Sequence, residues 1–214
     1  MTALERWRDL LPGWGIPQGD SGAAARIVGV DTSEDVLAAF REAANAVGIE
    51  AATVSGTWPD VAPSVELVDV AVCDHVLYNV RDLEPFARAL DAHVRLRVVV
   101  EITATHPLAW MADLWTTFHG LERPDGPDAG DALEALRELG FDAHRDDASR
   151  PPRAGGFEDR ADAVALIRRR LCLSADRDDE VAEALGSRLI ERDGLWSAGP
   201  AEQTVVTLWW DRSS

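Results

Sequence analysis

The sequence predicts one α/β domain spanning residues 1–214, with a mostly parallel sheet, helices on both faces and an antiparallel C-terminal strand. Short apolar runs rich in β-branched residues, typical of buried parallel strands, alternate along the chain with amphipathic segments of helical period. The strand–helix–strand spacing is that of right-handed parallel crossovers. The chain then closes on one more strong strand signal, TVVTLWW at 204–210.

The first half of the chain carries most of the strand signals. A short amphipathic helix over 2–11 is ended by Pro12 and Gly13, and the glycine- and proline-rich segment 12–22 is expected to be a loop. Ser33 can cap the next helix, which Gly48 ends. We therefore expect strands at 26–30, 49–55, 68–73 and 95–102, and helices at 34–47 and 82–92.

The second half is expected to be mainly helical. Asp131 and Glu134 have the spacing of a capping box, and Gly140 follows the helix that they begin. The segment 120–130 before them is polar and predicts a loop. Helices are expected at 107–119, 131–139, 158–171 and 176–190, with a weak strand at 141–145 and a flexible loop at 146–157.

The charge of the chain restricts its partners. The formal net charge is −17, so the mean field of the protein would repel a nucleic acid or an anionic membrane surface. Apolar runs fall far short of the ~18 residues that a membrane span needs, and the N-terminal segment lacks the apolar core of a signal peptide. Cys73 and Cys172 are far apart and show no zinc or disulfide spacing. These features predict a cytoplasmic protein with a small neutral or cationic ligand.

Polar side chains follow three of the predicted strands. Asp31 comes after the first strand, Thr57 and Trp58 follow the second, and Cys73-Asp74-His75 follow the third, with Tyr78 nearby. In open α/β sheets, ligands bind outside the carboxyl ends of the strands. The stretch 65–80 is therefore the predicted centre of a site, although an ordinary strand-to-helix loop would contain similar residues.

Two of these positions have a simple structural alternative. An acid such as Asp31 can accept hydrogen bonds from both hydroxyls of a ribose, but it would also favour a helix N-terminus. Trp58 could stack on an adenine, or it could anchor its loop against the core. Both alternatives stay open at the level of the sequence.

Three histidines are expected near the carboxyl edge of the sheet: His75, His106 and His119. Because an imidazole titrates near neutral pH, each is a candidate general base, while a purely structural role is the alternative. With Asp74 and Glu101 they could suggest a metal site. However, neither HxH nor HExxH spacing is present, so no metal is predicted.

The order of these motifs resembles that of class I S-adenosylmethionine-dependent methyltransferases, most closely a bacterial small-molecule subgroup. The resemblance implies a Rossmann-like methyltransferase fold and S-adenosylmethionine as cofactor. It assigns Asp31, with Thr32 beside it, to the ribose, Thr57 and Trp58 to the adenine, and Cys73, Asp74, His75 and Tyr78 to the methionine and acceptor side. The matching segments are IVGVDTSEDVLAAF, VSGTWPD, VDVAVCDHVLYNVRDLEPFARAL, VVVEITATHPLAWM, LWTTFHGLERPDGP and TVVTLWWD.

The sequence departs from that family at its start. The family's first strand and glycine-rich loop should precede Arg26, and no segment there has their pattern. We therefore expect the first βα unit to be missing. The leading hypothesis is methyl transfer to a small-molecule acceptor, with His75, then His106 or His119, as base. The alternatives are a non-catalytic binding or dimerisation module, and, less well supported, a nicotinamide-dependent oxidoreductase.

Overall fold

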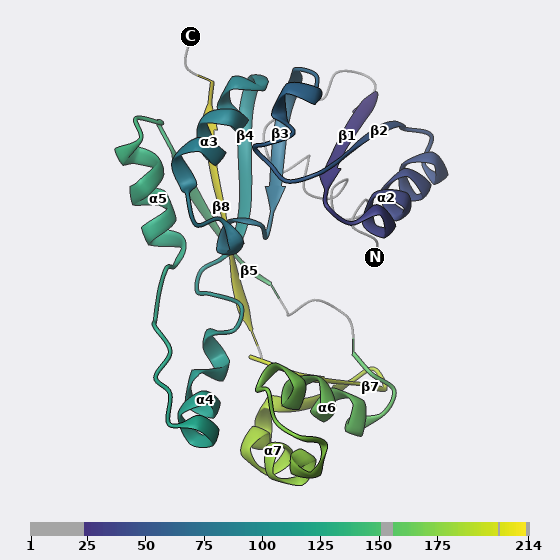
Figure 1. The fold of residues 1–214 in the computed structure, drawn as a ribbon, viewed down its shortest axis with the longest axis vertical. Helices are drawn as coiled ribbons and strands as arrows, with labels where there is room; N and C mark the ends of the chain where they lie inside the picture. The colour runs from purple at the N-terminus through teal and green to yellow at the C-terminus, as the bar shows by residue number, and fades with distance from the viewer. Residues whose placement is uncertain (1–23, 151–155, 201, 213–214) are drawn as a thin grey trace. The chain divides into compact units, whose positions relative to one another are not determined.

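The computed structural model describes residues 24–150, 156–200 and 202–212 (Figure 1). The chain divides into two compact units. The first contains the described residues up to Ala71 together with Asp82–Leu96, and the second contains Val72–Arg81 and the residues from Arg97 onward. The predicted helix at 2–11, the loop at 12–22 and the expected lack of a first βα unit lie outside the described residues and stay predictions.

The first unit contains a parallel βαβ crossover. Strands β1 (Arg26–Asp31) and β2 (Glu50–Ser55) pair in parallel, and helix α2 (Glu34–Ala46) connects them. The Ser33 hydroxyl caps α2 by accepting a hydrogen bond from the Val36 N–H, at 3.4 Å. Strand and helix approach closely at Gly29, where a Cβ would lie 2.9 Å from the Phe40 ring. These elements confirm the strands and the helix predicted for this region.

Helix α3 (Leu83–Ala92) completes the first unit, together with the short 3-10 turn η2 (Ala62–Ser64). Phe86 and Ala87 form the buried side of α3. The helix confirms the prediction for 82–92, since its apolar residues recur at helical spacing.

A four-stranded sheet has the order β3-β4-β8-β5. Its strands are β3 (Val68–Asp74), β4 (Val94–Thr103), β8 (Gln203–Asp211) and β5 (His144–Arg150). The bonds from Val68 N–H to the His93 carbonyl and from His75 N–H to the Glu101 carbonyl advance in the same direction along β3 and β4, as in a parallel pair. Strand β8 pairs antiparallel with both β4 and β5. The mixed sheet and its antiparallel C-terminal strand were predicted.

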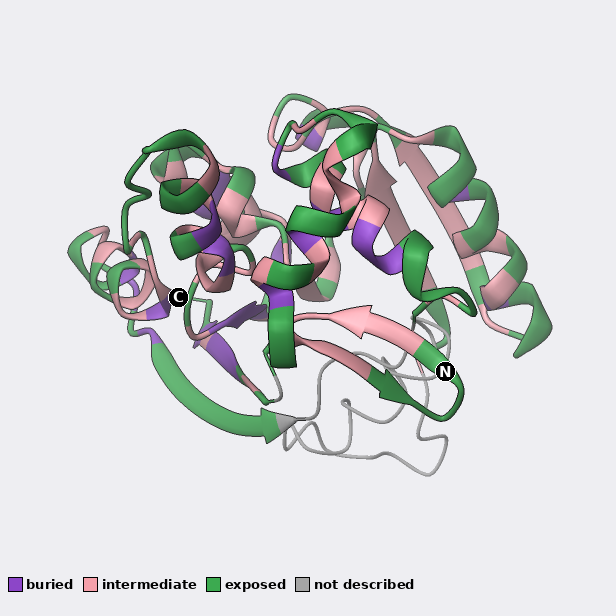
Figure 2. Cartoon of the chain, turned by 90° about the horizontal axis from the view of Figure 1, so that it is seen from below, coloured by how far each residue is buried: buried purple, intermediate pink, exposed green. Residues whose placement is uncertain are grey.

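The flexible loop predicted for 146–157 is wrong in its first part. Residues up to Arg150 belong to β5, which begins at His144 rather than at Phe141. The sequence of β5, HRDDASR, has no apolar period because its residues 144–149 are exposed, as the green strand with a grey tip in Figure 2 shows. Backbone pairing with the buried strand β8 holds this edge strand in place. Further on, Phe157 exchanges two backbone hydrogen bonds with Trp196, at 2.8 and 2.7 Å.

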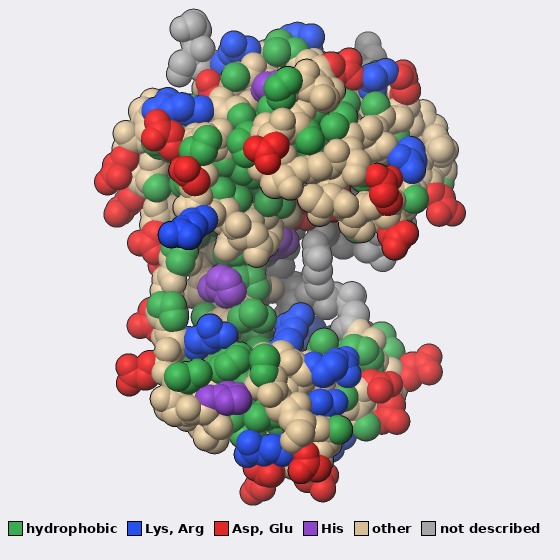
Figure 3. All heavy atoms as spheres, viewed as in Figure 1, with side chains coloured by type: hydrophobic (Ala, Val, Ile, Leu, Met, Phe, Trp, Pro, Cys, Tyr) green, Lys and Arg blue, Asp and Glu red, His purple; other side chains and the backbone are tan. Residues whose placement is uncertain are grey.

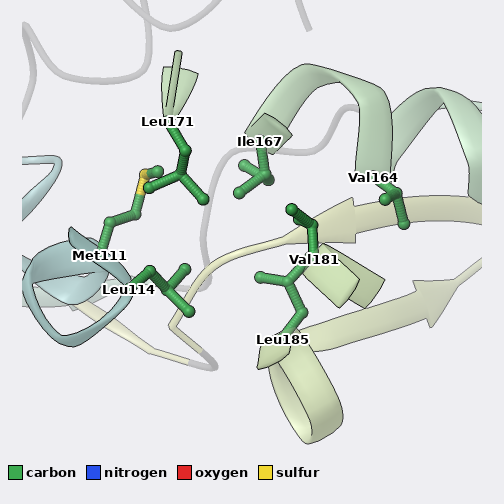
Figure 4. Packing of buried hydrophobic residues seen from close by; sticks show 7 residues of the cluster. All are labelled: Met111, Leu114, Val164, Ile167, Leu171, Val181 and Leu185. Carbon is green, nitrogen blue, oxygen red and sulfur yellow. The ribbon is translucent and has the colours of Figure 1, made fainter. Parts of the chain in front are cut away.

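Several helices of the second unit pack around an apolar cluster. The helices and 3-10 turns that follow β4 are η4 (Ala109–Met111), α4 (Ala112–His119), α5 (Ala129–Glu138), α6 (Arg160–Arg170), η5 (Ala175–Arg177), α7 (Asp178–Leu185) and η6 (Gly186–Arg188). The buried residues of the cluster, drawn in Figure 4, are Met111, Leu114, Val164, Ile167, Leu171, Val181 and Leu185. They come from η4, α4, α6, α7 and the residue that follows α6, so the cluster joins these helices.

Two details of this helical part differ from the prediction. Asp128, not Asp131, caps α5: its carboxylate accepts from the Gly130 and Asp131 N–H groups at 2.6 and 3.0 Å, while the Asp131 carboxylate accepts from the Asp128 N–H at 2.8 Å.

The helix expected to reach residue 190 ends at Leu185. The hairpin β6 (Leu189–Arg192) and β7 (Leu195–Ala198) follows, and its turn residues Asp193 and Gly194 both have positive φ. None of the described helices is long and apolar enough to cross a membrane.

Candidate active site

The loop after β3 is the best-defined part of the candidate site. Strand β3 ends at Asp74, and His75 turns the backbone with φ of 56°. That conformation is uncommon for residues other than glycine, although histidine adopts it more readily than most. The His75 N–H donates to the Glu101 carbonyl at 2.8 Å, which fixes the start of the loop against β4.

Tyr78 fixes the other end of this loop. Its hydroxyl oxygen accepts a hydrogen bond from the Thr103 N–H, and its hydroxyl group lies against both the Thr103 carbonyl, at 3.2 Å, and the Thr103 Oγ1. The Thr103 hydroxyl donates to the Thr105 carbonyl at 2.6 Å, so its oxygen is oriented to accept from Tyr78. Burial raises the pKa of the Tyr78 phenol, which therefore stays protonated at neutral pH. Tyr78 thus positions the loop and does not serve as a base.

The Tyr78 ring lies between two imidazoles. Its centroid is 6.3 Å from that of His75, with the planes 17° apart, and 5.3 Å from that of His106, in an edge-on arrangement at 71°. The His106 Nδ1 accepts a hydrogen bond from the Leu108 N–H at 3.1 Å. In a neutral His106 the proton is therefore on Nε2, so this ring can donate a hydrogen bond from Nε2 but has no lone pair there.

Two carboxylates lie beside His75. The His75 Nε2 is 3.6 Å from an Asp74 oxygen and 3.9 Å from a Glu101 oxygen. The Glu101 side chain is 5% exposed and that of Asp74 is 38% exposed. One donor atom from each of these three residues lies within 4.8 Å of the other two. Neighbouring ligands around a small divalent ion at ~2.1 Å are only ~3 Å apart, which is closer than the contacts of 3.6 and 3.9 Å found here, where both carboxylates approach the same imidazole nitrogen, Nε2.

His119 is not part of this group of contacts. Its Nε2 donates to the Leu171 carbonyl at 2.7 Å, and its ring lies 4.9 Å from that of Trp115. These contacts tie α4 to the end of α6. The geometry therefore supports a structural role for His119, which was one of the alternatives left open by the sequence.

The Cys73 side chain lies in the core rather than in the loop. It is 6% exposed, and burial raises the pKa of its thiol to about 12. A buried, protonated thiol is a poor contact for a ligand. Only the backbone of Cys73 is therefore available for binding.

The first unit places its own predicted residues at one end of β1 and β2. The Gly56 N–H donates to the Asp31 carbonyl at 3.0 Å, which brings the segment before Thr57 alongside Asp31. The Asp31 Oδ1 accepts from the Ser33 N–H at 2.8 Å. A carboxylate has about four acceptor positions, so this contact leaves Asp31 able to accept from the hydroxyls of a ribose. Thr32 and Thr57 are exposed beside it.

Trp58 is held by its own unit. Its indole N–H donates to the Phe86 carbonyl at 3.2 Å, and its ring meets that of His93 edge-on at 5.2 Å. The geometry therefore supports the anchoring role for Trp58, the second of its two interpretations.

Sequence reasoning missed Glu101 and Thr103 as parts of this site. Glu101 was considered only for a metal, and Thr103 not at all. A single carboxylate inside the apolar run VVVEI was the one available signal, since a charged residue inside a buried strand usually has a specific partner.

Comparison with known proteins bears on the fold. The chain is similar to a solved structure that concerns the conversion of a disulfide bond into a thioacetal group during echinomycin biosynthesis. The identity is 13% and the TM-score is 0.50, and the match covers 88% of this chain and 68% of that one. This likeness supports the α/β, Rossmann-like fold. No family model and no curated protein matches the chain.

Two further structures are similar at lower scores. Magnesium protoporphyrin IX methyltransferase from Synechocystis PCC 6803, with bound SAH, matches at 10% identity and a TM-score of 0.49, over 98% of this chain and 83% of that one. A SAM-dependent methyltransferase from Thiobacillus denitrificans, in complex with S-adenosyl-L-homocysteine, matches at 15% identity and a TM-score of 0.46, over 89% and 86%.

Proposed function

We propose that this protein transfers a methyl group from S-adenosylmethionine to a small-molecule acceptor. The observation that carries the proposal is the loop after β3, where two carboxylates lie near the His75 Nε2 and Tyr78 fixes the loop to β4. The resemblance of the sequence motifs to class I methyltransferases names the methyl donor, and the Rossmann-like fold is compatible with it.

Asp31 is the proposed ribose ligand, with Thr32 next to it, and Thr57 flanks the adenine. The Asp31 carboxylate keeps acceptor positions after its bond to Ser33. The hydrogen bond from the Trp58 indole N–H to the Phe86 carbonyl holds that loop in place. On the acceptor side we assign Asp74, Tyr78 and the backbone of Cys73.

When bound, S-adenosylmethionine supplies an electrophilic methyl group. His75 is the proposed base, which takes the proton of an acceptor hydroxyl, and the His106 Nε2–H is a hydrogen-bond donor beside it. Acidic side chains (red) are spread over the face of the molecule in Figure 3, with arginines (blue) among them. Such a surface favours a neutral or cationic acceptor over a polyanion.

Titration calorimetry of the full chain tests the cofactor assignment. We expect micromolar binding of S-adenosylmethionine and S-adenosylhomocysteine, and no binding of NADH. Asp31→Asn keeps an oxygen that can accept from Ser33 but loses the charge, and it should weaken binding tenfold or more, since hydrogen bonds to charged groups contribute about 1.5–3 kcal/mol. Asp35→Asn, an exposed acid in the first turn of α2, is the matched control. A folded protein that binds neither nucleoside would contradict the proposal and favour a non-catalytic module.

A further inference from the structure

Glu101 is a carboxylate inside a buried strand. It is 4% exposed, and its neighbours along β4 are the buried apolar residues Val100 and Ile102. Residues two apart in a strand share a face, so Glu101 lies on the same face of β4 as Thr103, the partner of Tyr78. A charge in such a place is unfavourable unless a specific partner stabilises it.

The backbone around His75 directs its imidazole toward Glu101. The His75 N–H is bonded to the carbonyl of Glu101 itself, and the positive φ of His75 turns the chain at that point. The hydrogen bonds between Tyr78 and Thr103 hold the loop three residues further on. Two attachments to one strand therefore keep His75 within 3.9 Å of the Glu101 carboxylate.

Among the contacts of the described residues, titratable groups lie beside His75 on three elements: Asp74 at the end of β3, Glu101 in β4 and Tyr78 in the 3-10 turn η3 (Leu77–Asn79). Tyr78 is neutral, as argued above. Asp74 is slightly nearer than Glu101, but it is much more exposed. Charges interact more strongly where water is excluded, because the effective dielectric constant is lower there. The more distant carboxylate therefore has the larger influence on the imidazole.

We propose that Glu101 is a positioning residue that orients the His75 imidazole and stabilises it when it carries a proton. This inference rests on the proposed function for its catalytic meaning. In the step concerned, the O–H bond of the acceptor breaks and its proton passes to His75. The acceptor oxygen bonds to the methyl carbon, whose bond to sulfur breaks, and S-adenosylhomocysteine leaves. The proton on His75 is then released to water.

The test follows the imidazole of His75 by ¹⁵N NMR through a pH titration of the full chain, without any ligand. His75→Gln assigns the signal. We expect Glu101→Gln to make His75 protonate at a pH lower by half a unit or more, which is a threefold or larger fall in its proton affinity. Asp74→Asn should have a smaller effect, and Glu138→Gln, an exposed glutamate in α5, should have none. Glu101→Asp, which keeps the charge, should restore most of the wild-type behaviour.

Several results would overturn the inference. One is an unchanged His75 titration in folded Glu101→Gln, and another is a larger effect of Asp74→Asn than of Glu101→Gln. A third is stoichiometric binding of Mn²⁺ or Zn²⁺ alone that abolishes the His75 titration, because the three residues would then be metal ligands. If Glu101→Gln does not fold, Glu101→Leu, which fills the buried position without a charge, takes its place, and an unchanged His75 titration in that variant would refute the coupling.

This test is separate from that of the proposed function. Calorimetry with S-adenosylmethionine reports on the cofactor alone, and we expect Glu101→Gln to bind it as the wild type does. A coupled His75–Glu101 pair in a protein that binds no S-adenosylmethionine would leave the pair standing and refute the methyltransferase. A protein that binds S-adenosylmethionine but shows no coupling between His75 and Glu101 would support the methyltransferase and refute the pair.

Discussion

The backbone N–H of Thr103 donates a hydrogen bond to the phenol oxygen of Tyr78, so the loop after β3 is attached to the last residue of β4. Together with the bond from the His75 N–H to the Glu101 carbonyl, this contact fixes both ends of the segment that contains the candidate base. The geometry of the site therefore depends on β4 as much as on the loop.

Replacing Tyr78 by Phe should destabilise the protein. The change removes the hydroxyl group and leaves the buried polar groups of Thr103 without it, which typically costs about 1–3 kcal/mol. Urea unfolding followed by tryptophan fluorescence measures the loss. In a double-mutant cycle with Thr103→Val, the two changes should be less than additive, because both remove the contact between the Tyr78 hydroxyl and the Thr103 Oγ1, while the backbone contacts of Thr103 are lost only in Tyr78→Phe. Strict additivity would contradict the contact.

The two cysteines should differ in reactivity. Cys73 is buried, and burial raises the pKa of its thiol from 9.0 to about 12, whereas Cys172 is exposed. An aromatic disulfide reagent at pH 8 should therefore label one thiol in the folded protein and two in urea. Rapid labelling of Cys73 in the folded chain would contradict its burial.

The same shift predicts how stability depends on pH. The folded-state pKa of Cys73 lies above the unfolded value, so its contribution is complete below pH 9 and is lost as the pH rises toward about 12. The free energy of unfolding should fall over this range, and it should fall less in Cys73→Ala. Parallel curves for the two proteins would refute this assignment.

Gly29→Ala should destabilise the first unit. The new Cβ would lie 2.9 Å from the Phe40 ring, so strand β1 and helix α2 would have to move apart. Overpacking of this kind costs roughly 1–3 kcal/mol. Gly199→Ala is the control, since a Cβ there meets no atom within 4 Å. Equal stability of both variants would mean that the close approach is not as the structure has it. Phe40→Leu should rescue Gly29→Ala in part.

Arg188 should stabilise the helical part of the second unit. Its guanidinium donates to the Trp110 carbonyl at 3.1 Å, the Asp113 carboxylate at 2.8 Å and the Ala184 carbonyl at 3.0 Å. Arg188→Lys has a single point of donation and cannot reach all three acceptors. We expect a loss of about 1–2 kcal/mol, measured by chemical unfolding, and a similar loss for Arg188→Ala.

The contact between Arg188 and Asp113 also has a pH dependence. The hydrogen bond from Arg188 lowers the pKa of the Asp113 carboxyl, so its contribution is present above the unfolded value of 3.8 and is lost as the pH falls through the folded one. The Asp113 side chain is 63% exposed, which keeps this part below about 1 kcal/mol. In Arg188→Ala the acid dependence of stability should be weaker than in the wild type; an equal dependence would contradict the contact.

The sequence predicted the elements that are specified by apolar period. Strand β1, helix α2 and strand β2 were predictable because β-branched runs, a capping serine and Gly48 delimit them. Strand β5 was predicted too early and too short, at 141–145 instead of His144–Arg150, since an exposed edge strand needs only backbone pairing and carries no apolar pattern. The β6–β7 hairpin was missed although Asp193-Gly194 is a typical turn signal, because its strands have only 4 residues each, too few to show an alternating pattern.

For the site, the sequence predicted the loop but not the residues that support it. Asp74, His75 and Tyr78 follow a strand directly and could be assigned from their position. Glu101 and Thr103 lie within and at the end of the next strand, and only the structure shows which face of β4 they share and what they contact. The hydrogen bonds that give His106 and His119 different roles are likewise tertiary contacts.

The most direct measurement is the formation of S-adenosylhomocysteine when the protein is incubated with S-adenosylmethionine and a low-molecular-weight extract fraction. We predict that the wild type forms more S-adenosylhomocysteine with the fraction than without it. His75→Gln should lose most of that increase and still bind S-adenosylmethionine, while His144→Gln, at an exposed position in β5, should retain it. A folded wild type that forms none, or a His75→Gln variant as active as the wild type, would contradict the account.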